Sequence, residues 1–328
     1  MTTVTQTQTL SGLEKPTSTL HLQGSSPPRS PKAEVTKTSE EPESDGPVEG
    51  VGYPGPDYKY KRFLPSFDHE YKLPPLEPFE HVDPGHAALS HANPRAFLDS
   101  ATVNNLTPKF GSEVSGIQLS ALTNEQRSQL GLYVAQRGVV VFRDQDFVDQ
   151  PPEWQLQDWG AFWGRLHIHP TSGQPKEFPE IHLVYKDAKP GSGFFNYKNN
   201  SVTTTGWHSD VTYEEQPPGL TTLFLYGRPG AGGDTAYVSQ VEAYNRLSPS
   251  FKAYLETLQV VHSGVEQANF SRAGNRGGVV KREPVENVHP LVRRHPVTGQ
   301  KALFVNKQFS RRIVGLKAEE SDAILNFL

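Results

Sequence analysis

The pattern of hydrophobic and polar positions predicts a series of short strands interspersed with a few helices. Thr123 and Gln126 fit a helix-capping box, and apolar residues follow them at helical spacing. Gly138 interrupts this spacing, and the continuous apolar run at 139–142 indicates a buried strand. By the same criteria we expect further strands at 182–185, 220–226, 235–238 and 303–305, and helices at 154–163, 240–258 and 319–328.

This succession of elements indicates a mainly β fold with flanking helices. The 28 glycines and 28 prolines imply many turns, which disfavours a helical bundle. Several short strands with irregular connections are typical of a β-barrel or a double-sheet domain with helices outside it. We assign this domain to residues 101–328.

The first hundred residues differ in composition from the rest. Residues 1–50 contain no Phe, Tyr or Trp and are rich in Thr, Ser, Pro and Glu, so they cannot bury enough apolar surface to offset the entropy of ordering. We expect a disordered tail there. Residues 51–100 combine aromatic residues with prolines and lack periodicity, which favours an extended arm lying on the domain surface. A recognition peptide for a partner is the alternative.

Composition and charge exclude several classes of function. The chain has no Cys, which removes disulfides, thiolate zinc sites, iron–sulfur clusters and cysteine nucleophiles. Any metal must therefore be held by His and carboxylates. The net charge of −4 gives no basic footprint for nucleic acid. Because no apolar run approaches the ~20 residues of a membrane span, and no secretory signal is expected, we predict a cytoplasmic protein with no nucleic-acid or membrane partner.

Two His-x-Asp sequences are candidates for a metal site. His81-Val-Asp83 lies in the proline-rich arm directly before Pro84, and a turn with a surface His explains it. His208-Ser-Asp210 instead precedes a β-prone stretch, and in a strand residues i and i+2 project to the same face. An imidazole and a carboxylate at one point supply two ligands of the 2-His-1-carboxylate triad typical of Fe(II) oxygenases. A hydrogen-bonded His–Asp pair at a strand end is the alternative.

The context of the second His-x-Asp sequence resembles a known enzyme family. In order along the chain come Trp207-His-Ser-Asp-Val-Thr212, Pro217-Pro-Gly219, Gly232-Gly-Asp-Thr235, Ala302-Leu-Phe-Val-Asn306 and Phe309-Ser-Arg-Arg-Ile-Val314. This series resembles the taurine dioxygenase family of Fe(II)- and 2-oxoglutarate-dependent enzymes, and within it most of all the fungal sulfonate branch. The resemblance extends from about Tyr58 to the last residue. It implies a double-stranded β-helix, or jelly-roll, core.

The resemblance also implies roles for individual residues. His208 and Asp210 match the first two iron ligands of the family, and Thr235 matches the threonine that hydrogen-bonds 2-oxoglutarate. His169 matches a histidine that holds the sulfonate of taurine, and Phe309 matches an aromatic residue that lines the same pocket. The implied cofactor is Fe(II), with 2-oxoglutarate and O₂ as cosubstrates.

Two departures from the family pattern bear on the substrate. Thr204 stands where taurine-specific members carry a pocket Asn, and Ser172 stands where they carry a pocket Tyr. The resemblance still implies hydroxylation of a small, taurine-like sulfonate, with release of sulfite, succinate and CO₂. The alternatives are the same chemistry on another small organic acid, such as an aryloxyalkanoate, and a non-catalytic jelly-roll remnant. Association into a homo-oligomer stays open.

The family pattern is incomplete in the sequence as given. In the family, a distal His that serves as third iron ligand and an Arg that pairs with 2-oxoglutarate lie C-terminal to the segment matched by 309–314. The sequence ends at Leu328, ahead of both positions. We therefore expect a jelly-roll that is incomplete at its C-terminal end, either because the sequence is a truncated version of a family member or because catalysis has been lost.

We predict that residues 1–50 are dispensable for the stability of the rest of the chain. Their composition leaves nothing with which to pack against the domain. Deleting them should leave the melting temperature unchanged in differential scanning calorimetry. A large drop in that temperature would show that the tail packs.

Overall fold

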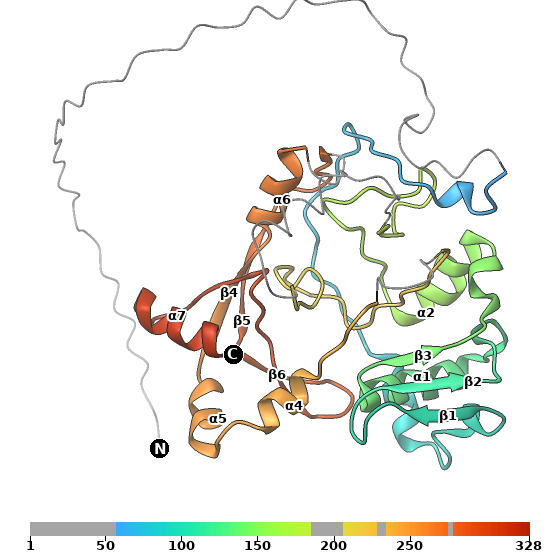
Figure 1. Ribbon diagram of the computed structural model, residues 1–328, viewed down its shortest axis with the longest axis horizontal. Helices are drawn as coiled ribbons and strands as arrows, with labels where there is room; N and C mark the ends of the chain where they lie inside the picture. The colour runs from blue at the N-terminus through green and yellow to red at the C-terminus, as the bar shows by residue number, and fades with distance from the viewer. Residues whose placement is uncertain (1–56, 185–205, 228–233, 275–277) are drawn as a thin grey trace, which may run out of the picture. The chain divides into compact units, whose positions relative to one another are not determined.

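The computed structural model describes residues 57–184, 206–227, 234–274 and 278–328 (Figure 1). All of these residues belong to one compact unit, Asp45–Leu328. The tail expected at 1–50 and the pocket residue Thr204 lie outside the described residues. Within the described ranges, none of the helices is long and apolar enough to cross a membrane.

The first part of the domain is a three-stranded sheet packed against one long helix (Figure 1). The strands are β1 (Thr102–Asn105), β2 (Ser112–Ser115) and β3 (Val140–Phe142), and the helix is α1 (Asn124–Arg137). The central strand β2 pairs antiparallel with β1 and parallel with β3, and α1 provides the crossover that a parallel pair requires. Helix and sheet bury a common apolar core of Phe97, Val114, Leu119, Leu122, Leu130, Tyr133, Phe147 and Trp159.

The boundaries of α1 follow from its flanking residues. The Thr123 side chain accepts a hydrogen bond from the backbone N–H of Gln126, and the Gln126 side chain accepts one from the N–H of Thr123. Gly138 ends the helix at a φ of 75°, a conformation that costs glycine least. Strand β3 then lies within the apolar run at 139–142, so the helix and strand predicted here are confirmed.

The second part of the domain contains an antiparallel sheet and a hairpin. The sheet has the order β5 (Glu286–Pro290), β4 (Gln259–Ser263), β8 (Ser310–Ile313), and the hairpin pairs β6 (Val292–Arg294) with β7 (Lys301–Leu303). In the described ranges, four α-helices accompany these strands: α4 (Gln240–Asn245), α5 (Pro249–Leu255), α6 (Val265–Arg272) and α7 (Ala318–Phe327). A second core comprises Tyr244, Leu255, Leu258, Val260, Leu291, Leu303, Val305 and Ile313.

The remaining helix predictions are confirmed in place and type. Helices α4 and α5 fill the segment at 240–258 and break before Pro249, while α7 fills 319–328. The segment at 154–163 forms a π-helical turn at Trp154–Gly160 that continues into α2 (Ala161–Trp163). Short 3₁₀ helices lie at Lys61–Phe63, Pro84–Ser90, Ala96–Leu98, Leu119–Ala121 and Asp146–Asp149.

Several strand predictions are wrong. In the described part of the chain, the segments 220–226, 235–238 and 182–184 form no strand. The apolar pattern reports only the propensity of a segment, whereas a strand forms only where its backbone groups pair with a neighbour. Leu223 and Leu225 accordingly keep 55% and 62% of their surface exposed. The strand expected at 303–305 forms two residues earlier, and the fold is a mixed arrangement of small sheets and helices.

The described part of the proline-rich arm is tied to the domain by backbone hydrogen bonds. Ser66 and Gln174 exchange two of them, with N···O distances of 2.7 and 3.2 Å. Further along, the N–H of Leu73 donates to the carbonyl of Lys281 at 2.7 Å. These bonds join the arm to two segments that are distant in sequence. They place it beside the residues considered below as a functional site.

A buried histidine in β4 makes the stability of the fold depend on pH. His262 is fully buried, and its Nδ1 lies 2.8 Å from the Thr212 hydroxyl. Burial, followed by the nearby His289, lowers the pKa of His262 to about 4. In the unfolded chain His262 takes up a proton near pH 6.5, whereas in the folded chain it does so only near pH 4. The contribution of neutral His262 to the free energy of unfolding is therefore fully present above pH 6.5 and is lost as the pH falls from 6.5 to 4.

We predict that His262→Gln flattens the acid dependence of stability. One proton over this pH window corresponds to at most about 3 kcal/mol. Urea unfolding at pH 7, 5.5 and 4.5 should show a steep fall in unfolding free energy for the wild type and a shallower fall for the variant. The matched His69→Gln substitution, at an exposed histidine, should keep the wild-type slope. An equal slope in all three proteins would contradict the prediction.

Candidate functional site

His208 and Asp210 lie in a coil and turn, and not in the strand predicted from their spacing. The backbone N–H of Glu214 donates to the carbonyl of Val211 at 3.0 Å, which closes a turn directly after Asp210. Val211 has a φ of +41°, an unusual value for a β-branched residue. An extended strand cannot continue through that conformation, which corrects the prediction. Outliers of this kind persist where the surroundings hold them, and they cluster at functional sites.

Buried side chains hold this turn in place. Val211 and Tyr213 pack with Phe309 in one small apolar cluster, and the rings of Tyr213 and Phe309 meet edge to face at 5.0 Å. The Tyr213 hydroxyl donates to Gln267 of α6 at 2.7 Å, and its backbone carbonyl accepts from Asn287 of β5 at 2.8 Å. The turn is therefore fixed from both the helix and the sheet side, which compensates for its strained backbone.

The two side chains still converge, as the resemblance implies. His208 Nε2 lies 3.3 Å from Asp210 Oδ1, and both side chains are partly exposed. The other ring nitrogen, Nδ1, donates to the carbonyl of Gly206 at 2.8 Å. In a neutral imidazole this bond places the hydrogen on Nδ1 and leaves Nε2 as an acceptor. When the ring is protonated, Nε2 donates to Asp210 instead, and this hydrogen bond lowers the pKa of Asp210 against the effect of burial, which would raise it.

His208 and Asp210 have the donor atoms of two of the three ligands in a 2-His-1-carboxylate metal site. Two electron-rich atoms, one imidazole nitrogen and one carboxylate oxygen, face each other at a distance that one cation can bridge. A metal-binding histidine commonly donates its second nitrogen to a backbone carbonyl, as His208 does to Gly206. Among the residues that the structure describes, no group of three or more His and carboxylate side chains could hold a metal ion. The pair therefore fits Fe(II) as a partial ligand set.

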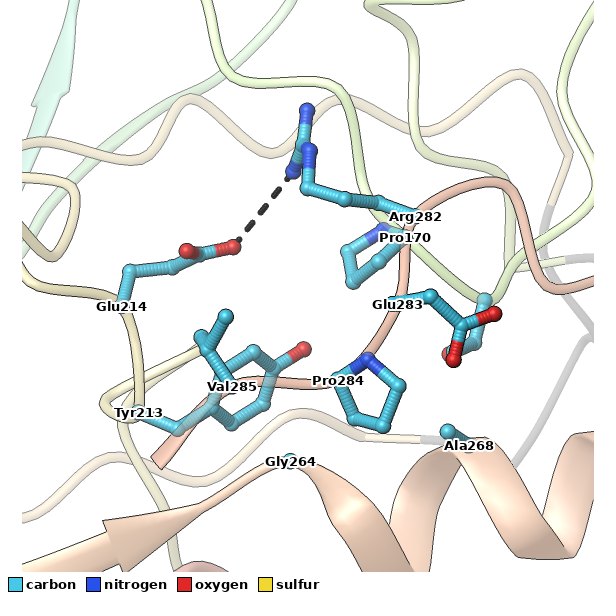
Figure 2. Close-up of a pocket in the computed structure, with 10 residues that line it drawn as sticks. Pro170, Tyr213, Glu214, Gly264, Ala268, Arg282, Glu283, Pro284 and Val285 are labelled. Atoms are coloured by element: carbon cyan, nitrogen blue, oxygen red, sulfur yellow. Dashed lines mark ion pairs between the residues drawn. The ribbon is translucent and has the colours of Figure 1, made fainter. Parts of the chain in front are cut away.

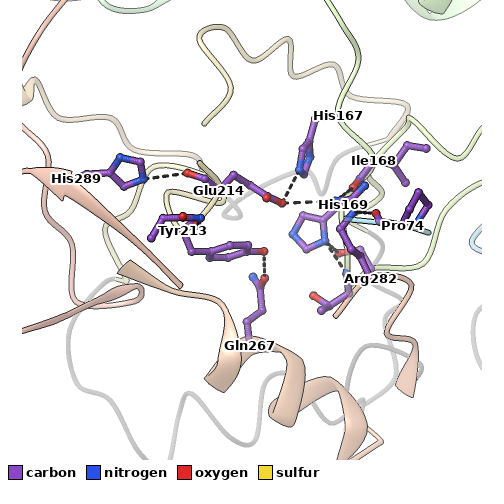
Figure 3. A network of polar contacts seen from close by, with 12 residues as sticks. Pro74, His167, Ile168, His169, Tyr213, Glu214, Gln267, Arg282 and His289 are labelled. Carbon is purple, nitrogen blue, oxygen red and sulfur yellow. Dashed lines mark hydrogen bonds and ion pairs between the residues drawn. The ribbon is translucent and has the colours of Figure 1, made fainter. Parts of the chain in front are cut away.

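Next to the turn, the buried carboxylate of Glu214 contacts side chains from two other segments of the chain (Figure 3). Glu214 is only 4% exposed, and its Oε1 lies 3.0 Å from His167 Nε2 and 3.5 Å from the Arg282 guanidinium. Arg282, equally buried, also donates to the carbonyls of Pro74 at 3.0 Å and Ile168 at 3.4 Å. Burial lowers the pKa of Arg282, and the charge of Glu214 opposes that shift. The network joins the arm, the 167–169 segment and the turn.

The pocket between these groups is too small for a substrate. Glu214 and Arg282 face each other across it, with Tyr213 and Val285 below (Figure 2). Its cavity volume is about 10 Å³, which is room for roughly one water molecule. A larger hollow of about 300 Å³ is bordered by Glu153, Glu177 and Glu180. Arg62 already pairs with Glu153 and Glu177, so the described residues of this rim offer no unpaired cation to an anionic ligand, and neither hollow fits a sulfonate in this conformation.

His169, the residue matched to sulfonate binding, belongs to a separate polar cluster. Its Nδ1 lies 2.9 Å from the Ser172 hydroxyl, which in turn lies 2.8 Å from His182 Nε2. The rings of His169 and His182 stack with centroids 4.2 Å apart. His167 turns to Glu214 instead, so the His-x-His sequence at 167–169 forms no metal pair.

The other predicted site residues, Phe309 and Thr235, differ in burial and in the contacts they make. Phe309 is buried, and its ring lies edge to face with that of His208 at 6.1 Å. Thr235 is exposed on an irregular segment. Two residues later, the pKa of Tyr237 is raised by burial and then by the charge of Asp210, so this segment passes near the His–Asp pair. Phe309 therefore lies beside the His208 ring, and the roles of Phe309 and Thr235 stay predictions.

Sequence reasoning missed Glu214, Arg282 and His182. Glu214 follows Asp210 by four residues, but nothing in its neighbourhood distinguishes it from the exposed Glu215. Arg282 comes from a segment with no recognisable pattern, and the apolar pattern around His182 predicted only a strand. A polar residue that folding brings to its partner is visible in a sequence only when that partner lies at a fixed spacing, and these partners lie 10 to 208 residues apart.

Comparisons with known proteins agree with the resemblance. The model of the family described as taurine catabolism dioxygenase TauD, TfdA family, matches residues 102–328. An alpha-ketoglutarate-dependent sulfonate dioxygenase of Saccharomyces cerevisiae is 43% identical over 275 residues, which cover 82% of this chain and 65% of that protein. The alpha-ketoglutarate-dependent dioxygenase cnsP of Penicillium expansum is 38% identical, over 82% of this chain and 72% of its own. The chain thus spans less than two thirds of the yeast relative's length.

A solved structure gives the same match. The crystal structure of a taurine dioxygenase from Burkholderia xenovorans has 28% sequence identity to this chain and a TM-score of 0.50. The match covers 70% of this chain and 71% of that chain. Sequence and structural similarity therefore point to the same set of proteins.

We predict that Glu214→Gln destabilises the fold strongly. Removing the carboxylate leaves the buried guanidinium of Arg282 without its counter-charge, and breaking a buried pair in this way costs roughly 3–5 kcal/mol. Glu215→Gln, at the exposed neighbour, should change the unfolding free energy by less than about 0.5 kcal/mol. Urea denaturation compares the two variants, and equal effects would contradict the role assigned to Glu214.

Proposed function

Because this chain belongs to the TauD/TfdA family of taurine catabolism dioxygenases, we propose that it is an Fe(II)- and 2-oxoglutarate-dependent dioxygenase. Its proposed substrate is a small sulfonate, which is hydroxylated with release of sulfite, succinate and CO₂. The sulfonate is favoured over an aryloxyalkanoate because the yeast relative, at 43% identity, is named a sulfonate dioxygenase. Taurine dioxygenases among the solved structures support the same choice.

The convergence of His208 and Asp210 carries this proposal. His208 Nε2 and Asp210 Oδ1 would both bind the iron, and the bond from Nδ1–H to Gly206 keeps the His208 ring in the orientation and tautomer that binding needs. Fe(II), when bound, supplies the activation of O₂ in concert with 2-oxoglutarate. The protein supplies ligands, orientation and exclusion of water.

Three other residues are proposed to hold the organic ligands. The Thr235 hydroxyl would donate to a carboxylate of 2-oxoglutarate, and its segment passes near Asp210. His169 would donate to the sulfonate, with Thr204 and Phe309 lining the same pocket. Phe309 packs against the ring of His208, which places an apolar wall beside the metal ligands.

We also propose that the sheet β5-β4-β8 and the hairpin β6-β7 belong to a jelly-roll core. Support comes from the antiparallel pairing of both units and from the match to a taurine dioxygenase structure. In such a core the turn carrying His208 and Asp210 would sit at one end of the sheets. β4 and β5 both contact this turn, through His262 and Asn287.

We predict 2-oxoglutarate turnover that depends on a sulfonate. Succinate formation should be measured on the full-length protein with Fe(II), taurine, longer alkanesulfonates and an aryloxyalkanoate. We expect sulfonates bulkier than taurine to be accepted, since Thr204 is smaller than the Asn it replaces. His208→Ala and Asp210→Ala should abolish turnover, because each removes a metal ligand.

Two matched substitutions serve as controls. His91→Ala alters a histidine directly after the 3₁₀ helix Pro84–Ser90, and Asp322→Ala alters an exposed aspartate of α7. Both should leave turnover unchanged. A preference for the aryloxyalkanoate would favour the alternative substrate class, and strict preference for taurine would contradict the expected pocket size. Turnover in the His208→Ala variant would contradict the assigned metal site.

A further inference from the structure

Three polar side chains next to the proposed site form a single chain of hydrogen bonds. His182 Nε2 lies 2.8 Å from Ser172 Oγ, and Ser172 Oγ lies 2.9 Å from His169 Nδ1. The backbone N–H of Thr171 also points at His169 Nδ1, at 3.2 Å. His169 and Ser172 are buried, while His182 is exposed.

A backbone amide fixes the direction of the hydrogen bonds that join His169, Ser172 and His182. Because the amide N–H of Thr171 can only donate, His169 Nδ1 must be an acceptor and carries no hydrogen. The Ser172 hydroxyl must then donate its one hydrogen to His169 Nδ1. Having done so, Ser172 Oγ can only accept from His182, whose Nε2 therefore carries a hydrogen. It follows that the neutral His169 ring carries its hydrogen on Nε2.

We propose that Ser172 and His182 form a relay that holds His169 as the Nε2–H tautomer, so that the ring offers a hydrogen-bond donor to an anionic oxygen of the substrate. Ser172 and His182 are thus positioning residues that act through His169. The identity of the ligand rests on the proposed function, whereas the tautomer of His169 does not. Sulfonate and carboxylate oxygens accept hydrogen bonds and cannot donate them, so such a ligand at Nε2 needs a hydrogen on that nitrogen.

Packing shows why the relay is rigid. The His169 and His182 rings stack at 4.2 Å with 22° between their planes, and Ser172 bridges their nitrogens at one edge. The Thr171 amide, the Ser172 hydroxyl and the face of the His182 ring all hold His169 in place. Fixing a side chain in this way reduces the entropy that substrate binding must overcome.

A nucleophilic role for Ser172 fits the geometry less well. A serine that donates to a histidine can act as a nucleophile, but the Ser172 side chain is 97% removed from solvent. Its oxygen also already accepts from His182. Ser172 therefore acts through the His169 ring, to whose Nδ1 it donates.

The relay is tested by measuring the tautomers directly. The full-length protein, labelled with ¹⁵N-histidine and free of metal, should be studied by long-range ¹H–¹⁵N correlation NMR at pH 8. His169→Gln and His182→Gln assign the two ring systems by loss of their signals. Ser172→Ala removes the relay, Ser172→Thr restores the hydroxyl, and Ser120→Ala removes a hydroxyl that bonds the Asp146 carboxylate instead.

We expect wild-type His169 and His182 both to show protonated Nε2 and unprotonated Nδ1. In Ser172→Ala, the His182 signals should move toward a tautomer mixture and those of His169 should broaden, while Ser172→Thr restores the wild-type pattern and Ser120→Ala leaves it intact. In the turnover assay, Ser172→Ala should raise KM for the sulfonate about fivefold, the effect of one modest hydrogen bond, with kcat little changed.

Protonated Nδ1 on either ring of the wild type would overturn the relay, as would identical spectra for wild type and Ser172→Ala. If Ser172→Ala does not fold, the wild-type tautomers and the His182→Gln variant decide the question. Failure of every acid to support turnover would contradict the proposed function, and the NMR spectra would still decide the relay.

Discussion

The buried carboxylate of Glu214 is the constraint on which the geometry of the site depends. Its two side-chain partners, His167 and Arg282, come from segments far away in sequence, and its backbone carbonyl accepts from His289 of β5 at 2.9 Å. A charge removed from water is tolerated only with good partners. The fold therefore cannot form without bringing these segments together. The same contacts position the turn that carries His208 and Asp210.

The site uses backbone groups to give two histidines opposite hydrogen-bonding character. The carbonyl of Gly206 accepts from His208 Nδ1–H, which leaves Nε2 as an electron pair suited to a cation. The amide of Thr171 donates to His169 Nδ1, which places the hydrogen on Nε2 and suits an anion. A dioxygenase of this family must hold a metal and an acidic substrate close together. In the function proposed for this chain, the direction of two backbone hydrogen bonds would suit His208 to the metal and His169 to the acid.

Much of the local structure could be predicted from sequence, because it depends on neighbours in the chain. The limits of α1 follow from Thr123, Gln126 and Gly138, and the break between α4 and α5 follows from Pro249. The strands expected at 220–226 and 235–238 failed because strand formation depends on a pairing partner, which periodicity does not report.

In the candidate site, too, the features that depend on local spacing could be predicted, and those that depend on distant partners could not. The His-x-Asp spacing correctly brought His208 and Asp210 together, although a turn with a positive φ at Val211 replaces the expected strand. The polar groups that hold the site could not be predicted, since Glu214 and Ser172 find their partners only in three dimensions. The resemblance marked Ser172 as a departure from the family. The contacts in the fold give this residue two histidine partners.

Binding of Co(II), a paramagnetic substitute for Fe(II), tests most directly whether His208 and Asp210 form the metal site. In ¹H NMR of the Co(II)-loaded full-length protein, a histidine ligand bound through Nε2 gives a strongly shifted, exchangeable Nδ1–H signal. The geometry predicts such a signal from His208, slow to exchange because Gly206 protects it, and absent from His208→Ala. Unchanged shifted signals in that variant, or full Co(II) affinity in both His208→Ala and Asp210→Ala, would contradict the assignment.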